Sequence, residues 1–406
     1  MYDGACAREH GESVVTRPVV TLSARGVDRL RSGHPWIYRS DIAASAAGPG
    51  DIVRVESERK RPLGTGLWSS ESQISLRFLG SDAIADERVW LDDRLRAALA
   101  FRKTLEIDAT AWRLVNAEGD RLPGLIVDVY GEGAERIVVV QTLAQGMDRR
   151  LPMITEALVD LLAPAGVLAR NDPRVRRLEG LPEEVTVTFG EVPDEVEVVE
   201  GGLRYRVNLR EGQKTGLFLD QRENHAAAGR YARGRALDGF AYHGGFALRL
   251  AQQCDSVLAM DSSAPAVAQM LANARLNGLA NIEARDVNVF DELRELEIAR
   301  ERFDTIVLDP PAFAKNKASV PRAAAGYKEI NLRALKLLTP GGVLVTCSCS
   351  SNVDESLFEA ILLEAAADAR VAVTLVEKRS QARDHPILLA APETHYLKCF
   401  VLRKLG

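Results

Sequence analysis

Residues 303–313 read FDTIVLDPPAF, a short apolar run that ends in an acid followed by two prolines. Four comparable runs surround it: RALDGF (235–240), SVLAMD (256–261), IEARDV (282–287) and GGVLVTCSCS (341–350). Each ends in an acid, a glycine or small polar residues, and segments with helical spacing lie between them. Strands that alternate with helices in this way predict an α/β fold with a parallel, doubly wound sheet. Ligands of such sheets bind beyond the carboxyl ends of the strands.

The ends of the first three predicted strands favour an adenosine ligand. Asp261 ends the second strand, where an acid is placed to accept hydrogen bonds from a ribose diol, and Asp286 would accept one from the adenine amine. Gly244 and Gly245 remove side chains where the backbone must approach a ligand. GxGxxG is absent and GQKTG (212–216) lacks P-loop spacing, which disfavours nucleotide phosphates. We therefore predict S-adenosylmethionine, although each acid taken alone is also explained as a helix N-cap.

The DPPAF stretch predicts a site for a planar base. Pro310 and Pro311 hold the backbone extended and lack amide donors, so the Asp309 carboxylate and the carbonyls that follow are left to contact the substrate. Phe313 adds an aromatic surface. This motif class is common to methyltransferases that act on nitrogen or carbon atoms of bases, so the motif leaves the attacked atom open.

Two cysteines after the last run point to carbon as the target. Carbon 5 of a pyrimidine is a poor nucleophile, and a thiolate that adds at carbon 6 raises the electron density there. An amine target needs no thiol. Cys347 and Cys349 are two residues apart and would share one face of a continuing strand, so either is a candidate nucleophile. Two small buried hydrophobic residues at a strand end are the alternative.

The chain has 406 residues, too many for one compact core, and it divides by pattern into four segments. Residues 1–16 are polar and predict a disordered leader. Short apolar runs separated by Gly, Pro and Ser predict a small β-rich domain over 17–84. Mixed helical and strand patterns predict a central α+β domain over 85–195, and residues 196–406 contain the parallel sheet.

Charge is distributed unevenly between these segments. The formal net charge is −5, yet residues 17–80 carry ten Lys and Arg against six acids, so this segment is +4 and the remainder −9. Arg29, Arg31 and Trp36 would supply phosphate contacts and a stacking surface for RNA. The alternative is a solvated β surface with a core tryptophan.

Composition excludes several classes of protein. Five cysteines in a chain of this length do not form a disulfide framework, and none has paired zinc spacing, so we expect a cytoplasmic protein without a metal. No run of about 18 apolar residues is present, so we expect no membrane partner. A homodimer is compatible with the sequence, which does not fix the oligomeric state.

Several long motifs resemble those of the ribosomal RNA large-subunit methyltransferase I family. They are QKTGLFLDQR (213–222), LDGFAYHGGFAL (237–248), DPPAF, and SCS (348–350). SGHPWIYRSDI (32–42) resembles the N-terminal PUA domain of the family, RLVNAEGDRLPGLIVDVYG (113–131) resembles its central domain, and DHPILLAAPETHYLKCF (384–400) fits as well. The resemblance implies a C-terminal Rossmann-like class I methyltransferase domain, with S-adenosylmethionine as cofactor and cytosine carbon 5 of 23S rRNA as target.

Carried over by position, the resemblance implies a role for each motif residue. Cofactor contacts fall on Tyr242, Gly244, Gly245, Asp261, Asp286 and Asp309, and catalysis falls on Asp309 and Cys349. The predicted substrate contacts rest on the residues themselves: Pro310, Pro311 and Phe313 on the DPPAF motif, and Arg29, Arg31 and Trp36 on the basic N-terminal segment. Cys349 becomes the preferred nucleophile because it precedes Ser350 as in the family's signature. This chain departs from the family pattern at His243, which replaces a small hydroxyl residue, and at the additional Cys347.

Two other functions remain open. An RNA adenine or guanine amine methyltransferase also uses DPP with an aromatic, although Ala312 separates the prolines from Phe313 here. An inactive RNA-binding ribosome-assembly factor would keep the fold without the chemistry. The residue that removes the proton from carbon 5 is not assigned by the sequence.

Overall fold

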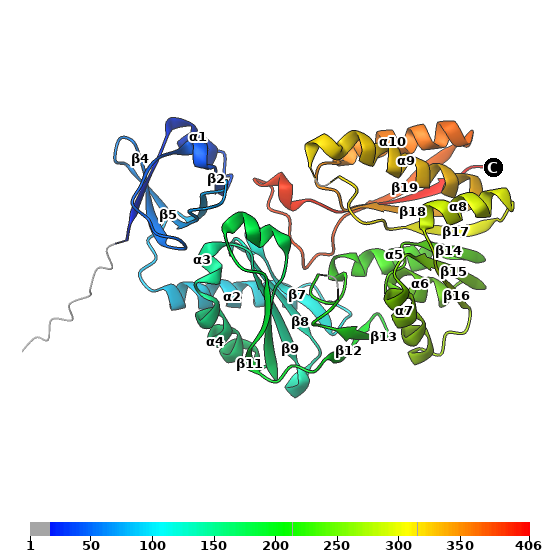
Figure 1. Cartoon of the computed structure of the whole chain (residues 1–406), viewed down its shortest axis with the longest axis horizontal. Helices are drawn as coiled ribbons and strands as arrows, with labels where there is room; N and C mark the ends of the chain where they lie inside the picture. The colour runs from blue at the N-terminus through cyan, green and yellow to red at the C-terminus, as the bar shows by residue number, and fades with distance from the viewer. Residues whose placement is uncertain (1–16, 213, 315) are drawn as a thin grey trace, which may run out of the picture.

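The computed structural model describes residues 17–212, 214–314 and 316–406, so the predicted leader over 1–16 lies outside the described residues, as does Gln213 of the QKTG motif. Three sheets and one hairpin follow one another along the chain (Figure 1). Within the described ranges, no helix is long and apolar enough to cross a membrane.

The first sheet has six strands in the order β2-β6-β5-β4-β1-β3. Its buried side chains, among them Val20, Ile37 and Val55, form a small core of their own. Helix α1 (Ala24–Arg31) begins where the Ser23 side chain accepts a hydrogen bond from the Gly26 amide. The strands are β1 (Val19–Leu22), β2 (Trp36–Ile37), β3 (Ile42–Ser45), β4 (Ile52–Ser57), β5 (Pro62–Trp68) and β6 (Leu76–Gly80).

The second sheet has five strands in the order β11-β10-β9-β8-β7, with α2 (Glu87–Lys103) and α4 (Leu151–Leu162) packed together. The sequence predicts one helix over 147–163, but α3 (Gln145–Asp148) ends before α4 begins. Pro152 lies in the first turn of α4, where its missing amide is tolerated. The strands are β7 (Ala111–Asn116), β8 (Leu125–Tyr130), β9 (Ile137–Thr142), β10 (Gly166–Asn171) and β11 (Glu184–Gly190).

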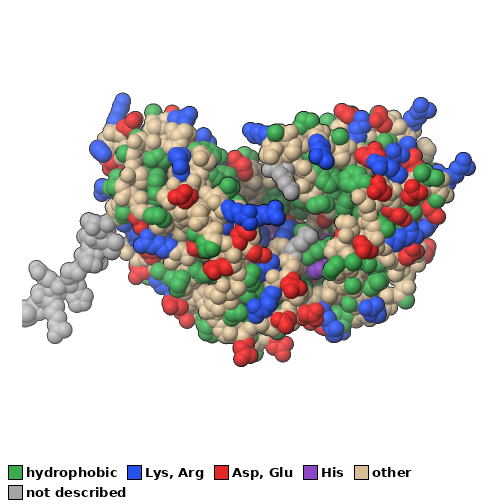
Figure 2. Space-filling model, viewed as in Figure 1, with side chains coloured by type: hydrophobic (Ala, Val, Ile, Leu, Met, Phe, Trp, Pro, Cys, Tyr) green, Lys and Arg blue, Asp and Glu red, His purple; other side chains and the backbone are tan. Residues whose placement is uncertain are grey.

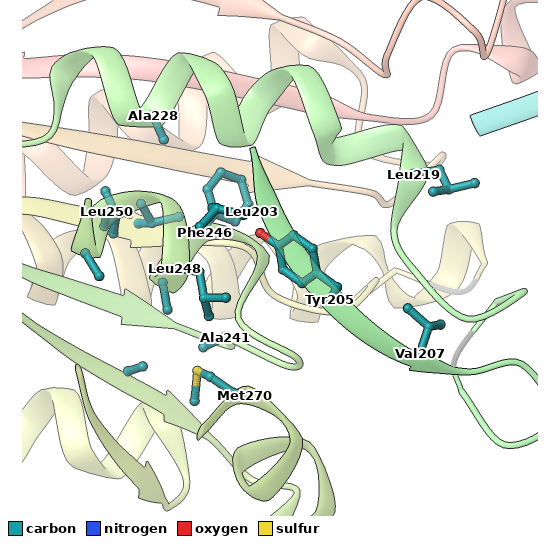
Figure 3. Close-up of a cluster of buried hydrophobic side chains, with 14 of the residues drawn as sticks. Leu203, Tyr205, Val207, Leu219, Ala228, Ala241, Phe246, Leu248, Leu250 and Met270 are labelled. Atoms are coloured by element: carbon teal, nitrogen blue, oxygen red, sulfur yellow. The ribbon is translucent and has the colours of Figure 1, made fainter. Parts of the chain in front are cut away.

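The stretch EVEVVEGGLRYRVNL (195–209), whose alternating pattern predicts a hairpin, forms β12 (Glu195–Glu200) and β13 (Leu203–Asn208), which turn at two glycines with positive φ. Figure 3 shows Leu203, Tyr205 and Val207 of β13 among apolar residues of α5 (Arg222–Tyr231), α6 (Gly245–Ala251) and α7 (Ala264–Leu276). This buried cluster joins the hairpin to the helices that cover the last sheet.

The last sheet has seven strands in the order β16-β15-β14-β17-β18-β20-β19. The first five run parallel, which confirms the predicted doubly wound sheet, and β20 inserts antiparallel between β18 and β19. The strands are β14 (Arg235–Gly239), β15 (Ser256–Asp261), β16 (Ile282–Asp286), β17 (Phe303–Leu308), β18 (Leu338–Ser348), β19 (Val373–Arg379) and β20 (Lys398–Lys404). The remaining helices are α8 (Val289–Ile298), α9 (Val320–Leu337) and α10 (Glu355–Ala369).

A buried aspartate connects the second sheet to the last one. Asp384 is fully buried in the segment between β19 and β20. Its carboxylate accepts from the Arg113 amide of β7 at 2.9 Å, from Arg222 Nη1 of α5 at 2.9 Å, and lies 2.8 Å from His385 Nδ1. Burial opposes the charge, but His385 and Arg222 hold the pKa of Asp384 well below its usual value. One carboxylate therefore ties three distant segments together.

We expect Asp384→Asn to lower the free energy of unfolding by about 3 kcal/mol or more, because it leaves the Arg222 charge buried without its carboxylate. Urea denaturation measures this. Asp368→Asn, which removes one acid of an exposed pair with Lys328, is the control and should cost at most about 1 kcal/mol.

The stability of the same variant should also depend on pH differently from that of the wild type. Since the folded pKa of Asp384 lies below the unfolded one, its contribution is full at neutral pH and is lost as the pH falls below about 4. The Asp384→Asn protein should therefore lose less stability on acidification than the wild type. An equally steep loss would contradict the role given to this carboxylate.

Candidate functional site

A cavity of about 810 Å³ opens at the carboxyl edge of the seven-stranded sheet. Its walls come from the segments after β14, β15, β16, β17 and β18 and from the segments around Lys214 and Tyr396. This volume falls in the range of small-molecule sites. Figure 2 shows that the surface is also hollowed between the N-terminal part and the α9 and α10 region, with Lys and Arg side chains gathered below this hollow.

The loop after β14 is tightly folded. Tyr242 and Gly244 have positive φ, of 47° and 89°. A Cβ atom on Gly244 would lie 2.4 Å from Leu248 Cδ1, and one on Gly245 would lie 2.5 Å from His225 Cε1. Tyr242 and Gly245 line the cavity, whereas Gly244 is not among the lining residues and is the N-cap of α6. Glycine is therefore required at both positions, and at Gly245 the backbone itself forms part of the cavity lining.

Asp261 lies at the end of β15 and lines the cavity. Its Oδ2 accepts from the Tyr242 amide and its Oδ1 from the Ser263 amide, both at 2.9 Å. These bonds fix the carboxylate, and because each carboxylate oxygen has two acceptor positions, one on each stays open for a diol.

Asp286 ends β16, but its side chain is exposed and is not among the residues that line the cavity. The lining at this strand end comes instead from Asn288, Val289 and Phe290. The predicted adenine contact of Asp286 therefore stays a prediction, and the three residues just after it were not singled out from the sequence.

His243, at which the chain departs from the family pattern, stacks its ring on Tyr242 with centroids 3.7 Å apart. Burial lowers the pKa of His243 to about 4, so its ring is neutral at physiological pH. The histidine thus extends the aromatic wall of the cavity and adds no charge to it.

Asp309 begins the loop after β17 and is surrounded by charged groups. Burial and, to a smaller degree, the nearby Asp220 carboxylate raise its pKa to about 6, although His225 and Lys214 oppose the shift. A pKa near neutrality lets this group hold or release a proton under ordinary conditions.

The residues after Asp309 form one wall of the cavity. Pro310, Pro311 and Phe313 line it together with Asp309, as the motif predicts. The Phe313 ring also packs on Tyr327 of α9, with centroids 4.6 Å apart. This wall offers flat apolar surfaces beside one titratable group.

The two cysteines occupy different environments, because β18 ends at Ser348, between them. Cys347 is fully buried opposite Cys399 of β20, and burial together with the Cys399 thiol raises its pKa well above the usual value. Cys349 lines the cavity, with its Sγ 3.8 Å from the Pro310 carbonyl oxygen. Burial raises the pKa of Cys349 to about 11, with Asp309 adding to the shift. Only Cys349 is thus placed to reach a ligand in this cavity.

Sequence reasoning assigned no chemistry to a charged cluster opposite Cys349. Lys214 pairs with Asp220, which also accepts from the Tyr396 hydroxyl at 2.7 Å, and all three residues line the cavity. Burial opposes the Asp220 charge, but Lys214 and His385 hold the pKa of Asp220 below its usual value. QKTG and FLDQR were noted as motifs, yet their contact with Tyr396 arises only in the fold.

The N-terminal residues predicted to bind RNA differ in how far their side chains are already bound within the protein. Arg29 donates to the buried Asp41 at 3.0 Å and its guanidinium lies 4.7 Å from the centre of the Tyr38 ring. The Trp36 indole donates to Glu118 of the second domain segment at 2.9 Å. Arg31 is largely exposed. Arg31 alone among these three has a side chain that projects mainly into solvent.

Comparison with known proteins finds two matching domain families and several similar proteins that align over nearly the whole chain. A PUA-like domain matches residues 20–80 and an S-adenosylmethionine-dependent methyltransferase matches 153–401. The ribosomal RNA large subunit methyltransferase I of Aeromonas hydrophila is 41% identical over 91% of this chain and 95% of its own. The protein of that name from Pseudoalteromonas atlantica is 37% identical over 95% and 99%. The crystal structure of SMU.776 complexed with SAH has a TM-score of 0.82 at 21% identity and covers 95% of this chain and 99% of its own, which shows a shared fold.

The charges around Cys349 predict its reactivity. Asp309 raises the pKa of the thiol, so Asp309→Asn should lower it and speed alkylation of Cys349 by iodoacetamide by about tenfold at pH 7.5. The effect should fade below pH 6, where Asp309 is itself protonated. Mass spectrometry of the Cys349 peptide gives the rate, with Asp291→Asn on α8 as the control. A rate that stays the same or falls in Asp309→Asn would refute this electrostatic assignment.

Proposed function

The chain belongs to the ribosomal RNA large subunit methyltransferase I family, and we propose that it transfers a methyl group from S-adenosylmethionine to carbon 5 of a cytosine in 23S rRNA. The observation that carries this proposal is the position of Cys349 on the cavity wall beside the DPPAF loop. A nitrogen target would have no use for a thiol at this point, whereas a pyrimidine carbon requires one.

The residues present fit S-adenosylmethionine. The Gly245 backbone passes where a Cβ would collide with His225, and the Asp261 carboxylate keeps acceptor positions for a ribose diol. The Phe240 and Phe290 rings lie edge to face, with centroids 6.1 Å apart, on the side of the cavity expected for adenine. Asp286 is kept as a proposed contact of the adenine amine. Bound S-adenosylmethionine supplies an electrophilic methyl group.

Cys349 is proposed to act on a cytosine that has been turned out of its stack into the cavity. The deprotonated Sγ adds to carbon 6, which forms a sulfur–carbon bond and moves an electron pair to carbon 5. Carbon 5 uses this electron pair to bond the methyl group, whose bond to the sulfonium sulfur breaks. A base removes the carbon 5 proton, the double bond forms again, and the sulfur leaves as thiolate.

Asp309 is proposed to orient the cytosine during these steps. Its carboxyl group starts the wall that Pro310, Pro311 and Phe313 continue, so a base against this wall presents its polar edge to Asp309. The charged form accepts from the exocyclic amine, and the protonated form, which a pKa near 6 keeps accessible, donates to the ring nitrogen.

Nucleoside analysis tests the proposal directly. We expect the purified protein, given rRNA and S-adenosylmethionine, to produce 5-methylcytidine. Cys349→Ala should abolish the product, whereas Cys347→Ala should keep it, since Cys347 faces Cys399 and not the cavity. Liquid chromatography with mass spectrometry identifies the product nucleoside.

The same assay discriminates the alternatives. Methyladenosine or methylguanosine as the product would establish an amine methyltransferase. RNA binding with no methyl transfer by the wild-type protein would point to an assembly factor.

We also propose that residues 17–84 form the domain that first contacts the RNA, with 85–195 and 196–406 as the central and catalytic domains. The first boundary lies between β6 and α2, and the second falls at the start of β12. The relatives named for ribosomal RNA and the PUA-like match support this assignment.

Arg31→Glu should weaken RNA binding and reduce the slope of log affinity against log salt by about 1, because one phosphate contact is lost. Cofactor affinity should not change. Arg275→Glu on α7 is the matched charge reversal in the last domain. Arg29 is unsuitable for this test, because a glutamate there would face the buried Asp41. An unchanged salt slope in Arg31→Glu would show that the phosphates are bound elsewhere.

A further inference from the structure

Lys398 is a lysine enclosed almost completely in the protein, with 2% of its surface exposed. It lies at the start of β20, directly opposite Ser348 of β18, and so beside the strand end from which Cys349 projects. Its Nζ donates to the Ser350 carbonyl at 2.8 Å and to the Tyr396 carbonyl at 2.9 Å. Lysines are rarely buried to this extent without a partner of opposite charge.

No carboxylate of the described ranges forms an ion pair with Lys398. The charged groups that act on it are the Cys349 thiol first, then Asp354 and Glu355 at the start of α10. Burial lowers the pKa of Lys398 to about 8, although Cys349 and, to a smaller degree, Asp354 and Glu355 oppose this shift. The ionisable group that would best compensate this buried cation is therefore the thiolate.

The other charged groups around Cys349 do not by themselves stabilise its thiolate. Burial and Asp309 raise the pKa of Cys349, while Lys214 and, to a smaller degree, Lys398 lower it. Lys214, however, is paired with Asp220, whose charge acts on the thiol in the opposite direction. Lys398 forms no ion pair with an acid in the described part of the chain, and Asp354 and Glu355 act on it less than Cys349 does.

The hydrogen bonds around Cys349 hold the thiol and the lysine in a fixed arrangement. Ser350 Oγ accepts from the Ala314 amide at 3.1 Å and lies 2.9 Å from the Tyr327 hydroxyl. The Ser350 carbonyl is bound by Lys398. The residue after the thiol is therefore anchored on both its side chain and its backbone, and this anchoring favours a preorganised site.

We propose that Lys398 is the counter-ion of the Cys349 thiolate: it stabilises the deprotonated sulfur electrostatically and orients it through the Ser350 carbonyl. The proton of Sγ passes to solvent, and Lys398 keeps its own proton in this state because the thiolate raises the pKa of the lysine. Lys398 is thus a positioning residue, since it acts through Cys349 and does not line the cavity. The catalytic use of the thiolate rests on the proposed function, but its stabilisation by Lys398 does not.

The pH profile of Cys349 alkylation tests this inference without RNA or cofactor. The thiolate displaces iodide from iodoacetamide and forms a sulfur–carbon bond, so the rate follows the thiolate fraction. Lys398→Met removes the charge but keeps the apolar stem of the side chain. This variant should move the alkylation profile to higher pH and lower the alkylation rate about tenfold at pH values below the pKa of Cys349. Lys398→Arg should keep the rate within about threefold of the wild type.

Lys404→Met is a matched control. Lys404 is on the same strand and also donates to two backbone carbonyls, those of Leu335 and Leu338, and none of these three residues lines the cavity. This variant should keep the wild-type profile of Cys349. If Lys398→Met does not fold, Lys398→Gln keeps amide donors for the carbonyls without the charge, and the same shift is expected.

A wild-type profile in a folded neutral variant would overturn the inference and leave Lys398 as a structural lysine. A shift in Lys398→Arg as large as that in Lys398→Met would also overturn it, because the charge would then not be the cause. Since the alkylation needs no nucleic acid, a wrong choice of target base would leave this result unaffected.

Discussion

The site depends on parallel pairing between β14, β17 and β18. Gly239 of β14 is in register with Leu308 of β17, and Leu308 in turn with Thr346 of β18. This register brings Asp309 and the Cys349 region to one edge of the sheet, although α9 and the whole of β18 separate them in the sequence. Any ligand that uses both groups must bind at this edge, and the tight glycine loop after β14 supplies another wall of the cavity.

The antiparallel strand β20 and the segment before it complete the site, and they bury several charged side chains. The segment before β20 carries Asp384 into contact with Arg113 and Arg222, and it places Tyr396 against Asp220. Charges removed from water in this way add little net stability, but removing one partner is costly. The arrangement therefore serves to hold the second sheet, the helix α5 and the cavity in one geometry.

The sequence was sufficient for the parallel sheet and for the main wall of the cavity, because strand-end acids, prolines and glycines are local signals. It was insufficient where contacts join distant segments. The insertion of β20, the separation of Cys347 from Cys349 and the Lys214, Asp220 and Tyr396 cluster depend on pairing across long stretches of chain. Likewise, no local pattern shows that Arg29 is bound to Asp41.

The central claim is that Cys349 forms a covalent bond with a cytosine. RNA that contains 5-fluorocytidine tests this claim most directly, since carbon 5 of that base carries no proton to remove and the adduct persists. Incubation with S-adenosylmethionine, followed by digestion and mass spectrometry, should give a nucleotide attached to the peptide that contains Cys349. An adduct on Cys347, or active protein that forms no adduct at all, would contradict the account.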